Sequence, residues 1–128
     1  MFLQSGPAMV IAACKAGVLG SFPTPNCRTT ADLEQWLQEI SGAVNPDTDA
    51  AWAVNLMMHR SNSRRFEDLD LAVKYEAPLV ISALGSPREA VEEVHAYGGK
   101  IYADVINPLF ARKAIDAVEN DDTVIVPW

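Results

Sequence analysis

Residues 78–105, PLVISALGSPREAVEEVHAYGGKIYADV, contain an apolar run, a helical segment and a second β-branched run. The run 79–82 is almost continuously apolar, which is typical of a strand in a parallel sheet whose two faces are both covered. Ser86-Pro87 predicts the start of a helix, and Gly98-Gly99 predicts its end. The segment 100–105 then predicts another strand. This order of elements is typical of a parallel βαβ unit.

The same alternation extends in both directions along the chain. Strands are predicted to start near residues 18, 51, 79, 100 and 123, a spacing of roughly 20 to 33 residues that suits one strand, one helix and two loops. Between them, helical periodicity and capping signals predict helices over 7–16, from an N-cap at Thr30 to about Ser41-Gly42, over 66–76, from Ser86-Pro87 to Gly98-Gly99, and after Asn107-Pro108. We therefore expect an α/β fold with one domain over residues 1–128.

Two parallel α/β architectures share this pattern, the (β/α)8 TIM barrel and the doubly wound open sheet. No G-x-G-x-x-G follows a predicted strand, and the pattern alone leaves the two architectures about equal. A complete barrel usually takes about 250 residues. If the fold is a barrel, 128 residues with about five βα units predict a partial one, with the first strand and the C-terminal units missing.

Charge and composition exclude several classes of partner. The formal net charge is -7 and no basic stripe is present, so we expect binding neither to nucleic acid nor to anionic membranes. No apolar run reaches the ~18 residues of a membrane-spanning helix, and no signal peptide is recognisable. Cys14 and Cys27 have neither disulfide nor metal-ligand spacing, which favours reduced thiols in the cytoplasm.

Polar residues at the carboxyl ends of the predicted strands are the candidates for function, because parallel α/β folds bind ligands there. Asn55 ends an apolar strand, where its amide needs either a backbone partner or a ligand. Asp104 could bind a ligand, bond to its own loop or cap the next helix. His59 could transfer protons, although an exposed loop histidine is the more common case. We expect His95 to lie on a solvated helix face.

Several short phrases in the chain resemble the nitronate monooxygenase family, also called 2-nitropropane dioxygenase-like. They occur in the family's order and spacing, and they are Met1-Phe2-Leu3 followed by Ser5-Gly6-Pro7, VIAACKAG at 10–17, VLGSFP at 18–23, AVNL at 53–56, HRSN at 59–62 and DVIN at 104–107. The resemblance implies an FMN-dependent barrel that oxidises alkyl nitronates with O2 to a carbonyl compound and nitrite. It also favours the barrel over the open sheet.

The resemblance assigns residues to the flavin. Met1 matches the end of the family's first-strand Ala-Pro-Met phrase, and Asn55 matches the asparagine that ends the third strand. Lys100 and Asp104 match the strand region that approaches the flavin, more loosely, and Ser82 is a weaker match still. The resemblance assigns no metal ligand.

The catalytic histidine of the family belongs to a Gly-Gly-His loop, which we expect beyond residue 128. No catalytic residue is therefore assigned within the chain, and we expect the chain alone to be inactive. A non-catalytic truncated product and a related FMN barrel, such as a flavin-dependent enoyl reductase, remain alternatives. Open barrel edges would also allow self-association.

Overall fold

The computed structural model describes residues 3–117 and 123–127. Its elements are α1 (Pro7–Lys15), β1 (Gly20–Pro23), the 3-10 helix η1 (Thr24–Asn26), α2 (Thr30–Ala43), β2 (Trp52–Met57), α3 (Arg65–Lys74), β3 (Leu79–Ala83), α4 (Arg88–Ala96), β4 (Lys100–Val105), α5 (Pro108–Ala117) and β5 (Thr123–Pro127). Within these ranges, no helix combines the length and the apolarity needed to cross a lipid bilayer.

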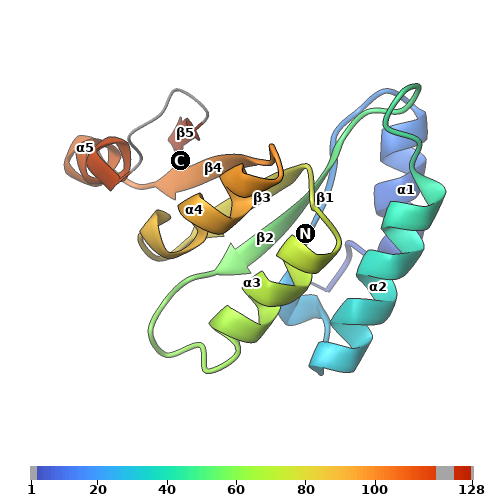
Figure 1. Cartoon of the computed structure of the whole chain (residues 1–128), viewed down its shortest axis with the longest axis horizontal. Helices are drawn as coiled ribbons and strands as arrows, with labels where there is room; N and C mark the ends of the chain where they lie inside the picture. Colours follow the sequence, from blue (N-terminus) through green and yellow to red (C-terminus); the bar gives the residue numbers. More distant parts are fainter. Residues whose placement is uncertain (1–2, 118–122, 128) are drawn as a thin grey trace.

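The strands form one parallel sheet in the order β1-β2-β3-β4-β5 (Figure 1). Each strand pairs with the next one along the chain, as in the pairings of Phe22 with Val54 and of Val54 with Val80. Parallel neighbours require a crossover connection, which the intervening helices provide. The predicted α/β fold with parallel strands is confirmed.

The two faces of the sheet have different surroundings because successive side chains of a strand point to opposite faces. In β2, Val54 and Leu56 are fully buried in the core that the helices build with Phe22 of β1 and Ile101 of β4. Their neighbour Asn55 points the other way and lines a cavity. Helices therefore cover one face, and the cavity meets the other face at Asn55.

The first strand begins two residues later than the sequence predicts. Gly17 adopts φ 79 and ends α1 with a left-handed turn, in which the Val18 N–H bonds to the Ala13 carbonyl at 3.0 Å. Val18 is consequently 61% exposed and lies outside the strand. Gly20 begins β1 against α1, where an added Cβ would lie 2.5 Å from the Val10 carbonyl oxygen.

The N-cap of α2 is Thr29, and the predicted Thr30 is the first helical residue. The Thr29 hydroxyl accepts the Asp32 N–H at 3.1 Å, and the Asp32 carboxylate accepts the Thr29 N–H at 3.0 Å. This reciprocal capping box needs an acidic or amide residue three positions after the cap. With a cap at Thr30, that position would be Leu33, whose apolar side chain cannot accept a hydrogen bond from the N–H of the cap residue.

Both cysteines are buried free thiols, and we expect neither to react with a thiol reagent in the folded protein. Cys14 is fully buried and Cys27 is 2% exposed. Burial raises the pKa of Cys27 to about 12, so the reactive thiolate is scarce near neutral pH. Labelling with a chromogenic disulfide at pH 8 should be slow in buffer and should release two thiols per chain in denaturant. Rapid labelling of the folded chain would contradict this burial.

Candidate functional site

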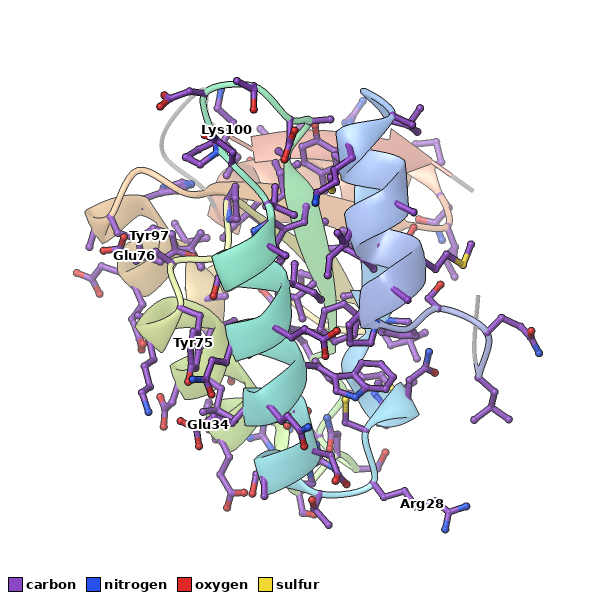
Figure 2. All side chains as sticks on the ribbon, turned by 90° about the vertical axis from the view of Figure 1, so that its right-hand side faces the viewer. Arg28, Glu34, Tyr75, Glu76, Tyr97 and Lys100 are labelled. Atoms are coloured by element: carbon purple, nitrogen blue, oxygen red, sulfur yellow. The ribbon has the colours of Figure 1, made fainter. Side chains whose placement is uncertain are left out.

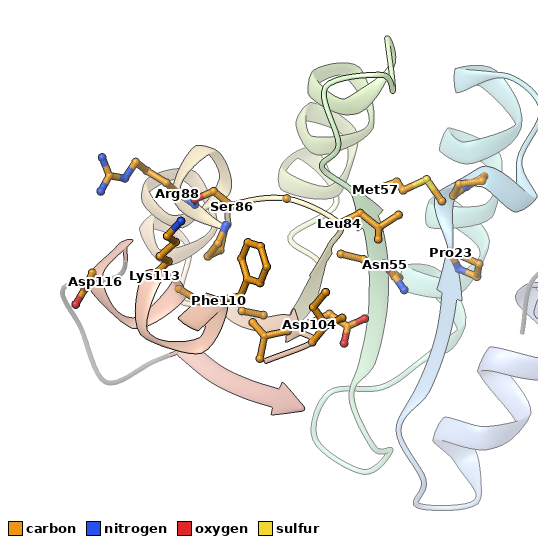
Figure 3. A pocket seen from close by; sticks show the side chains of 18 residues that line it. Pro23, Asn55, Met57, Leu84, Ser86, Arg88, Asp104, Phe110, Lys113 and Asp116 are labelled. Atoms are coloured by element: carbon orange, nitrogen blue, oxygen red, sulfur yellow. The ribbon is translucent and has the colours of Figure 1, made fainter. Parts of the chain in front are cut away.

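A cavity of about 920 Å³ lies at the carboxyl-terminal edge of the sheet (Figure 3). Its floor comes from the ends of β1 to β4, and its mouth comes from the loop 84–87, the first residue of α4 and the helix α5. The volume is within the range of about 300–1,000 Å³ that is usual for small-molecule sites. The position is the one at which TIM barrels bind their ligands.

Asn55 contributes an amide to the cavity floor. It lies in β2 between Pro23 of β1 and Ile81 of β3, so apolar side chains flank it on the cavity face. Among the residues that the structure describes, none forms a hydrogen bond with this side chain. An amide held in apolar surroundings without a partner is costly unless water or a ligand bonds to it. Of the two sequence alternatives, the geometry favours a ligand over the backbone.

Asp104 contributes a carboxyl group from the end of β4. Burial raises the pKa of this carboxyl above its ordinary value, because the charged form loses contact with water. The next helix, α5, is capped by Asn107, whose side-chain oxygen accepts the Phe110 N–H at 2.9 Å. Asp104 therefore does not act as the cap. No hydrogen bond joins its carboxylate to any residue in the described ranges.

Asn55 and Asp104 share one face of the sheet and are two strands apart. The register pairs Asn55 with Ile81, and Ser82 with Ala103, so Asp104 lies about two residues further along its strand than the level of Asn55. Spacings of ~4.8 Å between strands and ~3.3 Å along them put the two Cα atoms about 12 Å apart. The floor thus presents two polar groups with an apolar strip between them.

The mouth of the cavity is mostly apolar. Leu84 is 63% exposed and Ile106 is 71% exposed, and both line the cavity. Phe110 lines it from α5, with the Lys113 ammonium 5.6 Å from its ring centroid. Figure 3 shows Leu84 on the side of Asn55 and Phe110 on the side of α5. The mouth suits a ligand with a flat apolar surface.

The sequence-predicted flavin residues do not all meet at this cavity. Lys100 begins β4 and lines a small hollow with Tyr97 at the opposite edge of the sheet. Four residues of strand separate it from Asp104, which is about 13 Å. Lys100 is therefore not part of this site. Ser82 shares the helix-facing side of β3 with Val80 and is 1% exposed. Met1 lies outside the described residues.

The HRSN phrase has a structural role in the loop after β2. The Asn62 amide donates to the Met57 carbonyl at 2.9 Å, and its side-chain oxygen accepts the Arg64 N–H at 3.1 Å. His59 is exposed and accepts the Ser61 N–H at its Nδ1 at 3.2 Å. His59 does not line the cavity. The structure thus favours the exposed loop histidine over a proton-transfer group.

The expectation for His95 is wrong. This side chain is half-buried, and its Nε2 is inaccessible and has no hydrogen-bond partner among the described residues. His95 follows the buried Val94 and is four residues after Val91, which packs against the core. Its position on α4 therefore leaves the imidazole ring of His95 partly covered by neighbouring side chains. It lies far from the cavity, because α4 runs from the mouth towards the opposite edge.

Sequence reasoning also missed the apolar part of the site. Pro23, Met57, Leu84 and Phe110 line the cavity. The alternation of side chains along strands places Met57 and Pro23 on the same sheet face as Asn55, so the sequence contains a signal for these two residues. No local signal distinguishes Leu84 or Phe110 from ordinary loop and helix residues.

The parallel α/β architecture and the cavity at the carboxyl-terminal edge of the sheet together indicate the structural class of the chain. Comparison with solved structures shows that the chain folds as part of a TIM barrel, with the cavity at the edge where such barrels bind ligands. The identities are too low to show more than the fold. No protein-family model and no curated protein sequence matches the chain.

Structures of two proteins illustrate the similarity. FabK from Thermotoga maritima superposes with a TM-score of 0.77 at 20% identity, over 91% of this chain and 35% of that one. Its M276A variant gives the same TM-score and covers 37% of that chain. A nitroalkane oxidase from Streptomyces ansochromogenes superposes with a TM-score of 0.73 at 19% identity, over 88% of this chain and 40% of that one. This chain therefore spans well under half the length of each protein.

Proposed function

We propose that the chain is the flavin-ring-binding part of an FMN-dependent oxidoreductase. The observation that carries the proposal is the pair of polar groups, Asn55 and Asp104, that face the cavity without partners among the described residues. A flavin ring is flat and apolar on its faces and polar at its edge. The apolar strip between the two side chains suits the face of such a ring, and the two side chains suit its edge.

The residues present fit the ring portion of the cofactor. The Asn55 amide is able both to donate to a ring carbonyl and to accept from a ring N–H. Asp104 is able to accept from a ring or ribityl donor, and to donate when it is protonated, which its raised pKa favours. When bound, the flavin supplies the electron transfer, and the protein contributes orientation and polarity.

We further propose that the reaction is the oxidation of an alkyl nitronate by O2, which yields a carbonyl compound and nitrite. Three observations support this choice, and one of them, the fold similarity, is shared with FabK. The AVNL, HRSN and DVIN phrases resemble the nitronate monooxygenase family, and the fold is similar to that of a protein named as a nitroalkane oxidase. Within the described residues the cavity offers the cations Arg88 and Lys113 near its mouth, which suit an anionic substrate.

A flavin-dependent enoyl reductase is the second candidate. The exposed apolar residues at the mouth, Leu84, Ile106 and Phe110, suit a long apolar acyl group better than a small nitronate. The two reactions differ in their reductant, because the enoyl reductase consumes a nicotinamide dinucleotide whereas nitronate oxidation needs none. A protein that contains this chain and the remaining barrel units should therefore be assayed for nitrite release and for nicotinamide oxidation.

The chain itself provides the direct test of flavin binding. We expect Asn55→Ala to raise the Kd for FMN about 5- to 10-fold, because loss of one ligand hydrogen bond costs about 1 kcal/mol. Quenching of FMN fluorescence on titration with the chain measures the Kd. Asn45→Ala is the matched control, since Asn45 lies in the loop before β2 and bonds only within that loop. Equal Kd values for wild type and Asn55→Ala, or no binding at all, would contradict the proposal.

A further inference from the structure

Leu84 combines two unfavourable features at the mouth of the cavity. Its φ of 59 lies in the left-handed region, which a leucine rarely adopts because its Cβ crowds the backbone. Its side chain is also 63% exposed, so it does not gain the stability of a buried leucine. The fold therefore keeps a large apolar residue where glycine would be less strained.

The packing of the loop does not explain this choice. The close approach of the loop to Met58, the residue after β2, is made by Gly85, where an added Cβ would lie 2.6 Å from the Met58 carbonyl oxygen. Leu84 belongs to neither of the two apolar core clusters of the described residues. Its side chain instead lines the cavity, next to Asn55 and Met57 (Figure 3).

We propose that Leu84 is a ligand-contact residue that covers the apolar face of a flat ring bound in the cavity. Backbone strain of this kind is found mostly at ligand-binding and active sites, where the surrounding structure maintains it. The identity of the ring as a flavin rests on the proposed function. The inference about Leu84 itself requires only a flat apolar ligand.

The chain contains a matched control for the backbone effect. Glu76 also has a positive φ, 47, but it ends α3 and lines the small hollow at the opposite edge of the sheet, close to Tyr97 (Figure 2). Replacing it with glycine relieves the same kind of strain far from the cavity. Glu76→Gly should therefore raise the Tm and leave ligand binding unchanged.

Two substitutions at Leu84 separate strain from contact. Leu84→Gly removes both, so we expect a Tm about 2–4 °C higher and a Kd for FMN about 10-fold higher. Leu84→Ala keeps the strain and removes most of the contact, so we expect little change in Tm and a similar loss of affinity. A residue with only a structural role would not give higher stability together with weaker binding.

The measurement uses thermal melting and two fluorescent probes, FMN and the anionic dye 8-anilinonaphthalene-1-sulfonate, whose naphthalene ring is flat and apolar. If the wild type binds the dye but not FMN, and Leu84→Ala weakens dye binding, the flavin proposal fails and the role of Leu84 is supported. If wild type and Leu84→Ala bind FMN equally, the flavin proposal survives and the role of Leu84 is overturned. Failure of the wild type to bind either probe overturns both.

Discussion

Replacing Arg64 with methionine is expected to lower the free energy of unfolding by about 3 kcal/mol. The guanidinium joins the loop before α2 to the start of α3: it donates to the carbonyls of Cys27 and Arg28, both at 3.0 Å, and to the Asp68 carboxylate at 2.9 Å. The Asp68 side chain is only 4% exposed, so methionine leaves a buried charge unpaired. Breaking a buried pair on one side costs about 3–5 kcal/mol, and the 26% exposure of Arg64 puts the effect at the lower end.

Urea denaturation of three variants tests this prediction. Removing both charges, as in Arg64→Met with Asp68→Leu, should recover more than half of the loss, since no unpaired carboxylate remains. Asp68→Leu alone completes the double-mutant cycle. A loss below about 1 kcal/mol for Arg64→Met would show that the Asp68 carboxylate is well solvated without its partner. The substitution should also weaken flavin binding, because Arg64 holds the loop whose Pro25 lines the cavity.

Gly85→Ala is expected to have the second-largest effect, a loss of about 2–3 kcal/mol. The added Cβ would lie 2.6 Å from the carbonyl oxygen and 2.7 Å from the carbonyl carbon of Met58. These are backbone atoms, and the Met58 N–H is bonded to the Ala83 carbonyl at 2.9 Å, so neither loop moves freely. Overpacking against atoms that cannot rearrange typically costs about 1–3 kcal/mol.

The same substitution at Gly42 is the control. Gly42 lies in α2, and an added Cβ there meets nothing within 4 Å. Gly42→Ala should therefore stabilise the chain by about 0.5–1 kcal/mol, because alanine loses less backbone entropy in a helix. Thermal or urea unfolding should give opposite signs for the two glycines. A neutral Gly85→Ala would mean that the loop 84–87 shifts readily, and that the strain at Leu84 is easily relieved.

Most of the fold was predictable from the sequence because each unit carries its own local signals. Pro78 and the run after it specify β3, and Gly98-Gly99 separate α4 from β4. The predicted element boundaries differ from the structure where two sequence signals compete over one or two residues. Thr29 and Thr30 are both acceptable caps, and only the spacing to Asp32 decides between them.

The site was predictable only in part. Asn55 and Asp104 follow from the rule that parallel strands present their carboxyl ends to a ligand, and the structure places both at one cavity. Lys100 lies at the opposite edge of the sheet from the cavity, and a match to a strand region does not distinguish the two ends of the strand. Leu84 could not be predicted, since its exposure and its left-handed backbone depend on how the loop packs on Met58.

The strand order β1-β2-β3-β4-β5 has a consequence for how the chain folds. Because every strand pairs with its immediate predecessor, each new strand needs only the unit made just before it. Contacts close in sequence favour rapid folding, and domains form from the N-terminus as synthesis proceeds. A ribosome-bound nascent chain should therefore already protect the β1–β2 core around Phe22 and Val54 when β3 emerges, with the cavity completed only once β4 and α5 dock.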